Sequence, residues 1–174
     1  FSVLNLKNVS YNIIAKIELG GTKNSGVIAC QGGAMAGWAL FLNSIGRLKF
    51  VYNWFGKEFT EVCSPDRLAA GIHEIKINYE HDGGFGAGGF FRLLVDEILL
   101  DSKRINRTVP VIFSMSGETF DVGRNTGSPV SDYPNHFPFT GKIISVVLER
   151  LNEKDAVTLK EESKGRFAAS LSAQ

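Results

Sequence analysis

The segment Tyr11–Leu19, with the sequence YNIIAKIEL, decides the fold class because its apolar side chains recur at every second position. In an extended chain Ile13, Ala15 and Ile17 fall on one face, whereas Lys16 falls on the other. This alternation predicts a β-strand with one buried face. The same period occurs in two further segments, His73–Tyr79 and Phe91–Val95.

Other segments are apolar on both faces, which is typical of central strands covered on both sides. They are Gly26–Gln31, Trp38–Leu42, Leu48–Phe55 and Ile143–Leu151. Glycine-rich breaks separate them, and no long helical pattern occurs in the first 150 residues. We therefore expect an all-β fold, an antiparallel jelly-roll or concanavalin-like (laminin-G-like) β-sandwich over residues 1–151. Residues 152–174 form a polar tail, expected as a short helix from Asp155 or as a frayed end.

The composition indicates a single globular domain and excludes several partners. The 174 residues are 44% hydrophobic and 21% charged, with 19 basic against 18 acidic side chains. Binding to nucleic acid normally requires clustered basic residues, and none occur, so no nucleic-acid partner is expected. No apolar run approaches the roughly 20 residues that span a bilayer, so we expect a soluble protein without a membrane partner.

Aromatic residues cluster in the middle of the chain and suggest one binding site. Trp38, Tyr52 and Trp54 could stack on the apolar faces of sugar rings if they lie on an open sheet face. The competing interpretation is core packing, because large aromatic side chains dominate protein cores. Core packing is favoured.

Oxygen-bearing side chains in a glycine- and proline-punctuated loop suggest a second site. Asp121, Asn125 and Asp132 have the close spacing that calcium sites use together with backbone carbonyls. The alternative is turn chemistry, in which Asp and Asn bond their own backbone. Turn chemistry is favoured, and calcium is the only cofactor considered.

One string resembles a catalytic signature. Cys63–Arg67 (CSPDR) loosely matches the Cys-x-Pro-x-Arg motif in which sulfatases convert cysteine to formylglycine. The acidic metal-binding cluster and the large α/β domain required by that chemistry are missing, so no catalytic residue is assigned. We expect instead a strand end at Cys63, a turn at Pro65-Asp66, and a new strand from Gly71. Cys30 and Cys63 are expected as thiols, with one disulfide as the alternative.

Six stretches, in this order and spacing, carry a family resemblance: Gln31–Gly33 with Gly37–Leu42, Val51–Gly56, Tyr79–Gly84 with Gly88–Gly89, Arg107–Pro110, Glu118–Arg124 with Thr126–Val130, and Phe139–Ile143. From about Asn8 to Leu151 the chain resembles the C-terminal region of large bacterial arylsulfatases. In that family the region is a β-sandwich beside the catalytic domain, which holds the formylglycine and the metal ligands. The resemblance thus implies kinship without activity, and a bacterial cytoplasmic or periplasmic protein. Asn125 departs from the family, which commonly has Asp there.

Three functional hypotheses follow. The first is a non-catalytic accessory or interaction module, with a sulfatase catalytic domain as partner or with self-association as a homo-oligomer. The second is a lectin-like carbohydrate-binding protein, with or without calcium. The third is an enzyme, either a fragment of an active arylsulfatase or a sandwich-fold glycoside hydrolase, although no paired carboxylate pattern supports the hydrolase.

Overall fold

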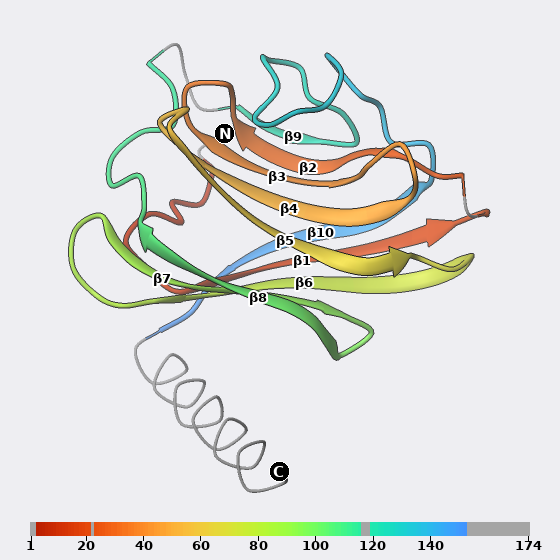
Figure 1. Ribbon diagram of the computed structural model, residues 1–174, viewed down its shortest axis with the longest axis horizontal. Helices are drawn as coiled ribbons and strands as arrows, with labels where there is room; N and C mark the ends of the chain where they lie inside the picture. The colour runs from red at the N-terminus through yellow and green to blue at the C-terminus, as the bar shows by residue number, and fades with distance from the viewer. Residues whose placement is uncertain (1–2, 22, 116–118, 153–174) are drawn as a thin grey trace, which may run out of the picture.

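The computed structural model describes residues 3–21, 23–115 and 119–152, which form two five-stranded β-sheets and, within these ranges, no helix (Figure 1). Sheet A has the strand order β10-β1-β6-β7-β8, and sheet B has the order β5-β4-β3-β2-β9. The strands are β1 (Tyr11–Leu19), β2 (Gly26–Gly32), β3 (Gly37–Leu42), β4 (Arg47–Trp54), β5 (Glu58–Arg67), β6 (Gly71–His81), β7 (Ala87–Val95), β8 (Ile98–Arg107), β9 (Phe120–Val122) and β10 (Lys142–Arg150).

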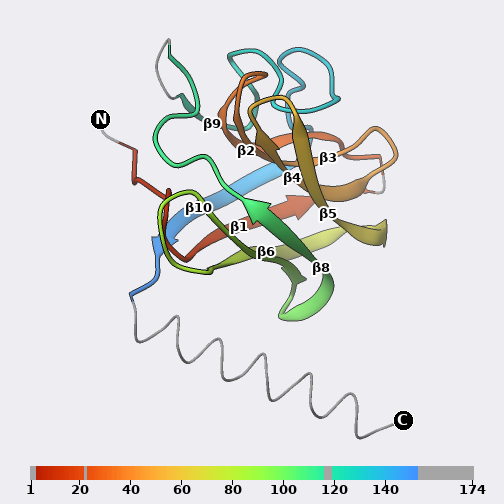
Figure 2. The same cartoon turned by 60° about the vertical axis from the view of Figure 1, so that its left-hand side comes forward.

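The strand pairings within the described residues are antiparallel. Strands β2 to β5 follow one another as neighbours in sheet B, and β6 to β8 do so in sheet A. Strand β1 lies between β6 and β10, and the two sheets pack face to face (Figure 2). The predicted antiparallel β-sandwich is confirmed. The predicted tail lies, from residue 153 onward, outside the described residues.

The main core fills the space between the two sheets. Every inward position that the period of two predicts in β1, β6 and β7 is buried, including Ile13, Ile77 and Phe91. Aromatic rings connect the layers, because the ring centroids of Phe50 in sheet B and Phe91 in sheet A lie 5.1 Å apart; within sheet A, those of Phe91 and Tyr79 lie 4.6 Å apart. Such ring pairs contribute about 0.5–1.5 kcal/mol beyond their buried area.

A second, smaller core lies on the outer face of sheet B. The segment 123–138 crosses that face, and its apolar side chains cover β2, β3 and β4. The members of this cluster are Val27, Cys30, Ala39, Phe41, Val51, Val130 and Tyr133, with Phe137 partly buried against them. This second layer explains why β2 and β3 are buried at every position, as their continuous apolar runs predict.

The covering segment packs closely against the sheet at Gly26. The φ angle of Gly26 is +112°, and an added Cβ would lie 2.1 Å from the carbonyl oxygen of Pro138. Only glycine tolerates both constraints at this position.

Two sequence predictions are wrong. Strand β10 was expected to be buried on both faces, but it lies at the edge of sheet A, and six of its nine side chains are exposed. Strand β5 does not end at Cys63 but continues to Arg67 through Pro65. This is allowed because β5 is also an edge strand, where a proline need not donate a ladder hydrogen bond. The prediction that β6 begins at Gly71 is confirmed.

An ion pair joins β6 to the β7–β8 turn. His73 Nδ1 lies 2.7 Å from Asp96 Oδ2, and the backbone amide of Glu74 donates to Asp96 Oδ1 over 2.9 Å. Burial alone would lower the pKa of His73, but its bonds to Asp96 and to the Ala69 carbonyl raise it above 6.5. Burial would raise the pKa of Asp96, but the bonds from Glu74 and His73 lower it below 3.8.

We predict that Asp96→Asn weakens the fold mainly at acidic pH. The His73 contribution is complete below about pH 6.5 and disappears as the pH rises through the raised pKa, and the Asp96 contribution is lost only below about pH 3.8. The variant should therefore lose about 0.2–1 kcal/mol near pH 5.5. The loss should be smaller near pH 8.5, as urea unfolding at the two pH values would show. Asn tolerates the positive φ of residue 96. An equal loss at both pH values would contradict the ion pair.

Candidate functional site

The outer face of sheet A carries a row of polar side chains that we call the polar ladder. It consists of Glu149 on β10, Asn12 on β1, Asn78 and Glu80 on β6, and Arg92 on β7. Four of these residues are direct partners in the sheet register, because Asn12 pairs with Glu149 and Asn78, and Asn78 pairs with Arg92. No described segment lies over this face in Figures 1 and 2.

A chain of hydrogen bonds connects the polar ladder, and each donor in it bonds an acceptor on the next strand from β7 toward β10. Arg92 Nη1 donates to Asn78 Oδ1 over 3.2 Å, and Arg92 Nη2 donates to Glu80 Oε2 over 2.8 Å. Asn78 Nδ2 donates to Asn12 Oδ1, and Asn12 Nδ2 donates to Glu149 Oε2, both over 2.9 Å. Only 5% of Asn78 and 8% of Asn12 is exposed, so the two amides are fixed in orientation.

An exposed aromatic ring lies beside the ladder. Phe90, on the same face of β7 as Arg92, is 40% exposed. The guanidinium carbons of Arg92 and Arg104 lie 5.9 and 5.1 Å from its ring centroid. Arg104 is held in turn by Asp82, to which its two terminal nitrogens donate over 2.8 and 2.5 Å. The ring is therefore flanked by two positioned guanidinium groups.

The polar ladder can bind a hydroxyl-rich ligand. Each Asn amide has a second N–H, and the carboxylates of Glu80 and Glu149 have a second oxygen, outside this chain of bonds. The two amides thus supply donors and the two carboxylates supply acceptors on one face of the sheet, while Phe90 adds an apolar surface. Sequence reasoning missed the site because its members are paired across strands, with Asn12 and Glu149 separated by 137 positions.

The predicted aromatic platform does not form. Trp38 is 0% exposed and Tyr52 is 3% exposed, and both lie in the main core. The favoured alternative of core packing therefore describes these two residues. Trp54 is half-buried, and the guanidinium carbon of Arg107 lies 3.7 Å from its ring centroid. A sugar could stack on that face of the indole only if Arg107 moved away from it.

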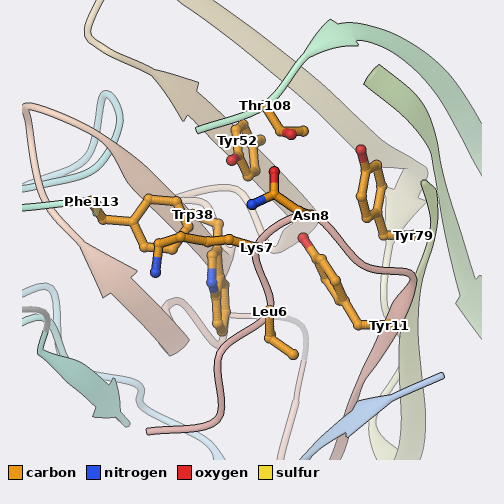
Figure 3. Close-up of a pocket in the computed structure, with 9 residues that line it drawn as sticks. All are labelled: Leu6, Lys7, Asn8, Tyr11, Trp38, Tyr52, Tyr79, Thr108 and Phe113. Atoms are coloured by element: carbon orange, nitrogen blue, oxygen red, sulfur yellow. The ribbon is translucent and has the colours of Figure 1, made fainter. Parts of the chain in front are cut away.

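A small pocket opens above Trp38 and Tyr52 at one end of the sandwich (Figure 3). Its lining residues are Leu6, Lys7, Asn8, Tyr11, Trp38, Tyr52, Tyr79, Thr108 and Phe113. The pocket has room for about one water molecule. Its phenol groups bond the protein itself, because Tyr79 donates to the Gly88 carbonyl over 3.0 Å and Tyr52 accepts from the Val109 amide over 2.9 Å. The pocket is thus too small for a sugar.

Two of the three predicted calcium ligands, Asp121 and Asn125, accept hydrogen bonds from the protein's own backbone. Asp121 Oδ2 accepts from both the amide and the hydroxyl of Thr126 over 2.7 Å, and Asp132 is exposed. Within the described part of the chain, no three His, Cys, Asp or Glu side chains gather at a spacing that could hold a metal ion. Asp121 therefore stabilises a turn, and calcium binding by these three residues stays a prediction.

Asn125 is fully buried and holds the segment 123–138 together. Its Nδ2 donates to the Ser128 carbonyl over 3.0 Å and to the Tyr133 hydroxyl over 2.9 Å. Its Oδ1 accepts from the Gly127 amide over 3.0 Å. Both ends of the amide are used by the protein, so Asn125 is a structural residue.

The two cysteines are free thiols. Cys30 is buried in the second core, where desolvation and then the charge of Asp121 raise its pKa to about 12. Cys63 is half-buried on the edge strand β5, and its backbone amide donates to Asp101 over 2.9 Å.

Comparisons with known proteins show the fold. No family model matches the chain, and no curated protein matches it at a significant level. Laminin α1 domains LG4-5 from mouse superpose with a TM-score of 0.58 at 19% identity, over 88% of this chain and 39% of that one. The CBM40 domain of Ruminococcus gnavus IT-sialidase superposes with a TM-score of 0.57 at 11% identity, over 87% of this chain and 83% of that one. The receptor-binding domain of botulinum neurotoxin type G superposes with a TM-score of 0.53 at 12% identity, over 88% of this chain and 38% of that one.

This chain therefore spans about two fifths of the laminin and neurotoxin chains and most of the CBM40 chain. The identities are low, so the likeness concerns the fold alone. The expected jelly-roll or laminin-G-like β-sandwich is confirmed.

We predict that Asn125→Asp lowers the free energy of unfolding by about 1–3 kcal/mol at neutral pH. A carboxylate would face the Ser128 carbonyl and lose the donors that Asn125 provides. Urea unfolding would measure the loss, with the exposed Asp132→Asn as a near-neutral control. Full recovery of Asn125→Asp in millimolar calcium would contradict a purely structural role for this loop.

Proposed function

We propose that this protein is a lectin-like module that binds glycans on the outer face of sheet A. The proposal is carried by one observation: an exposed phenyl ring, Phe90, lies beside a row of orientation-fixed amides and carboxylates. A pyranose presents apolar C–H faces and a rim of hydroxyls, which match these two kinds of surface.

The charges of the site favour neutral sugars. Arg92 is bonded to Glu80, and Arg104 is bonded to Asp82. An anionic sugar would have to compete with those carboxylates, whereas a hydroxyl can bond an arginine or a carboxylate without breaking either pair. We therefore assign neutral hexose units as the ligand.

The comparisons support glycans as the class of ligand, without distinguishing one sugar from another. The Ruminococcus gnavus CBM40 domain has been solved bound to α2,3- and α2,6-sialyllactose, with TM-scores of 0.55 to this chain. Binding surfaces on flat sheets are shallow, so we expect weak affinity for one sugar unit and a gain from repeated units.

The accessory role beside a sulfatase catalytic domain stays a prediction of the resemblance, and so does the absence of enzymatic activity. The structures reported above are laminin, sialidase and neurotoxin domains. In the described residues no helix is long and apolar enough to cross a membrane.

We predict that Phe90→Ala weakens binding to a neutral oligosaccharide about tenfold, because the stacking surface is lost. A glycan array with neutral and sialylated members would select the ligand, and calorimetric titration would measure the affinity. Glu149→Gln, which keeps an acceptor for Asn12 but removes the charge, should weaken binding less.

The matched control is Phe59→Ala, because Phe59 is 53% exposed but lies on strand β5 of the other sheet. The affinity of the Phe59→Ala variant for the oligosaccharide should equal that of the wild type. If Phe90→Ala binds normally and Trp54→Ala does not, the ligand binds at the end of the sandwich and the site proposed above is wrong.

A further inference from the structure

Four connecting segments meet at one end of the sandwich and form a surface that we call the loop end. They are residues 33–36, 54–57, 82–86 and 109–115, on the left in Figure 1. Asn53 Nδ2 donates to the carbonyls of Gly33 and Ala34, which joins the first two segments. Asn8 accepts from Gly86 and donates to Pro110, which joins the last two.

The loop end exposes apolar side chains on each of its four segments. The side chains are Met35 (43% exposed), Phe55 (39%), Phe85 (76%), Val111 (60%), Ile112 (43%) and Met115 (85%). Phe85 stands alone between Gly84 and Gly86, so nothing on its own loop covers it. Large apolar side chains gathered at such exposures mark an interaction surface.

The charges around these side chains are predominantly basic within the described residues. Both acidic groups there are bonded to arginines, Glu58 to Arg107 and Asp82 to Arg104. Lys57 lies on the β4–β5 turn, and Lys7 lies beside Phe113, with its Nζ 4.5 Å from the ring centroid. Lys57 therefore adds a basic side chain beyond those two ion pairs.

We propose that the loop end binds the surface of an anionic lipid bilayer, with Phe85 and Met115 inserted among the acyl chains and Lys57 near the headgroups. Apolar tips with a basic rim are the combination that holds a protein at the interface of an acidic membrane. The sequence analysis expected no membrane partner because it tested for a bilayer-spanning run, and interfacial binding requires none.

Charge also distinguishes a bilayer from a second copy of this chain. A symmetric dimer through the loop end would bring its excess of basic side chains against the same excess on the partner. The apolar residues stand on separate turns, which suits insertion between lipids better than contact with a flat protein surface. An anionic bilayer complements the basic side chains of the loop end and can accommodate apolar residues that stand on separate turns.

Vesicle flotation of the full chain tests the proposal. We expect binding to vesicles of phosphatidylcholine with phosphatidylserine and little binding to phosphatidylcholine alone, with a loss at high salt. The double variant Phe85→Ser/Met115→Ser should bind at least about tenfold more weakly, and Lys57→Glu should also weaken binding. These vesicles contain no glycan, so the result is independent of the function proposed above.

The matched control is Ile45→Ser/Ile98→Ser, which removes side chains of 54% and 64% exposure from the β3–β4 turn and the start of β8, both outside the loop end. It should bind like the wild type, and thermal unfolding would verify that both double variants are folded. No binding by the wild type, or equal binding by both double variants, overturns the proposal. A dimer in sedimentation velocity that only Phe85→Ser/Met115→Ser dissociates also overturns it, because the loop end would then bind a second copy.

Discussion

The packing of segment 123–138 against the outer face of β2, β3 and β4 determines which surfaces of this sandwich reach solvent. A two-layer sandwich would offer two outer sheet faces, but here one of them is a second hydrophobic core. The buried amide of Asn125 holds that covering segment in place. No described segment covers the outer face of sheet A in the same way, and the two proposed interactions use that face and one end of the sandwich.

The strand pattern could be predicted from the sequence because it depends on local periodicity. In β1, the alternation of Ile13, Ala15 and Ile17 with polar residues determines which side faces the core in any antiparallel arrangement. The continuous apolar runs of β2 and β3 correctly indicated cover on both faces. The same reasoning failed for β10, whose apolar run looks similar although its outer side chains face solvent, because edge position depends on strand order and not on local sequence.

The candidate site could not be predicted, for a related reason. Asn12 and Asn78 are ordinary polar residues at outward positions, and only the register of β1 against β6 brings their amides within 2.9 Å. Trp38 and Tyr52 are more conspicuous in the sequence, but both pack in the core, as the favoured interpretation predicted. Chemistry that is assembled across strands leaves no spacing signature along the chain.

The position of β1 has a consequence for how the protein is made. In the described sheet A, β1 pairs with β6 and β10, which follow it along the chain, so Asn12 finds one partner 66 residues later and the other 137 residues later. The hairpins β2–β5 and β6–β8 can close from neighbouring segments, because loop closure is less costly over short separations. Strand β1 is then left without its hydrogen-bonded neighbours until β6 has been synthesised, and with one open edge until β10 follows. The nascent chain therefore exposes an apolar strand edge that a chaperone would have to shield until β10 arrives.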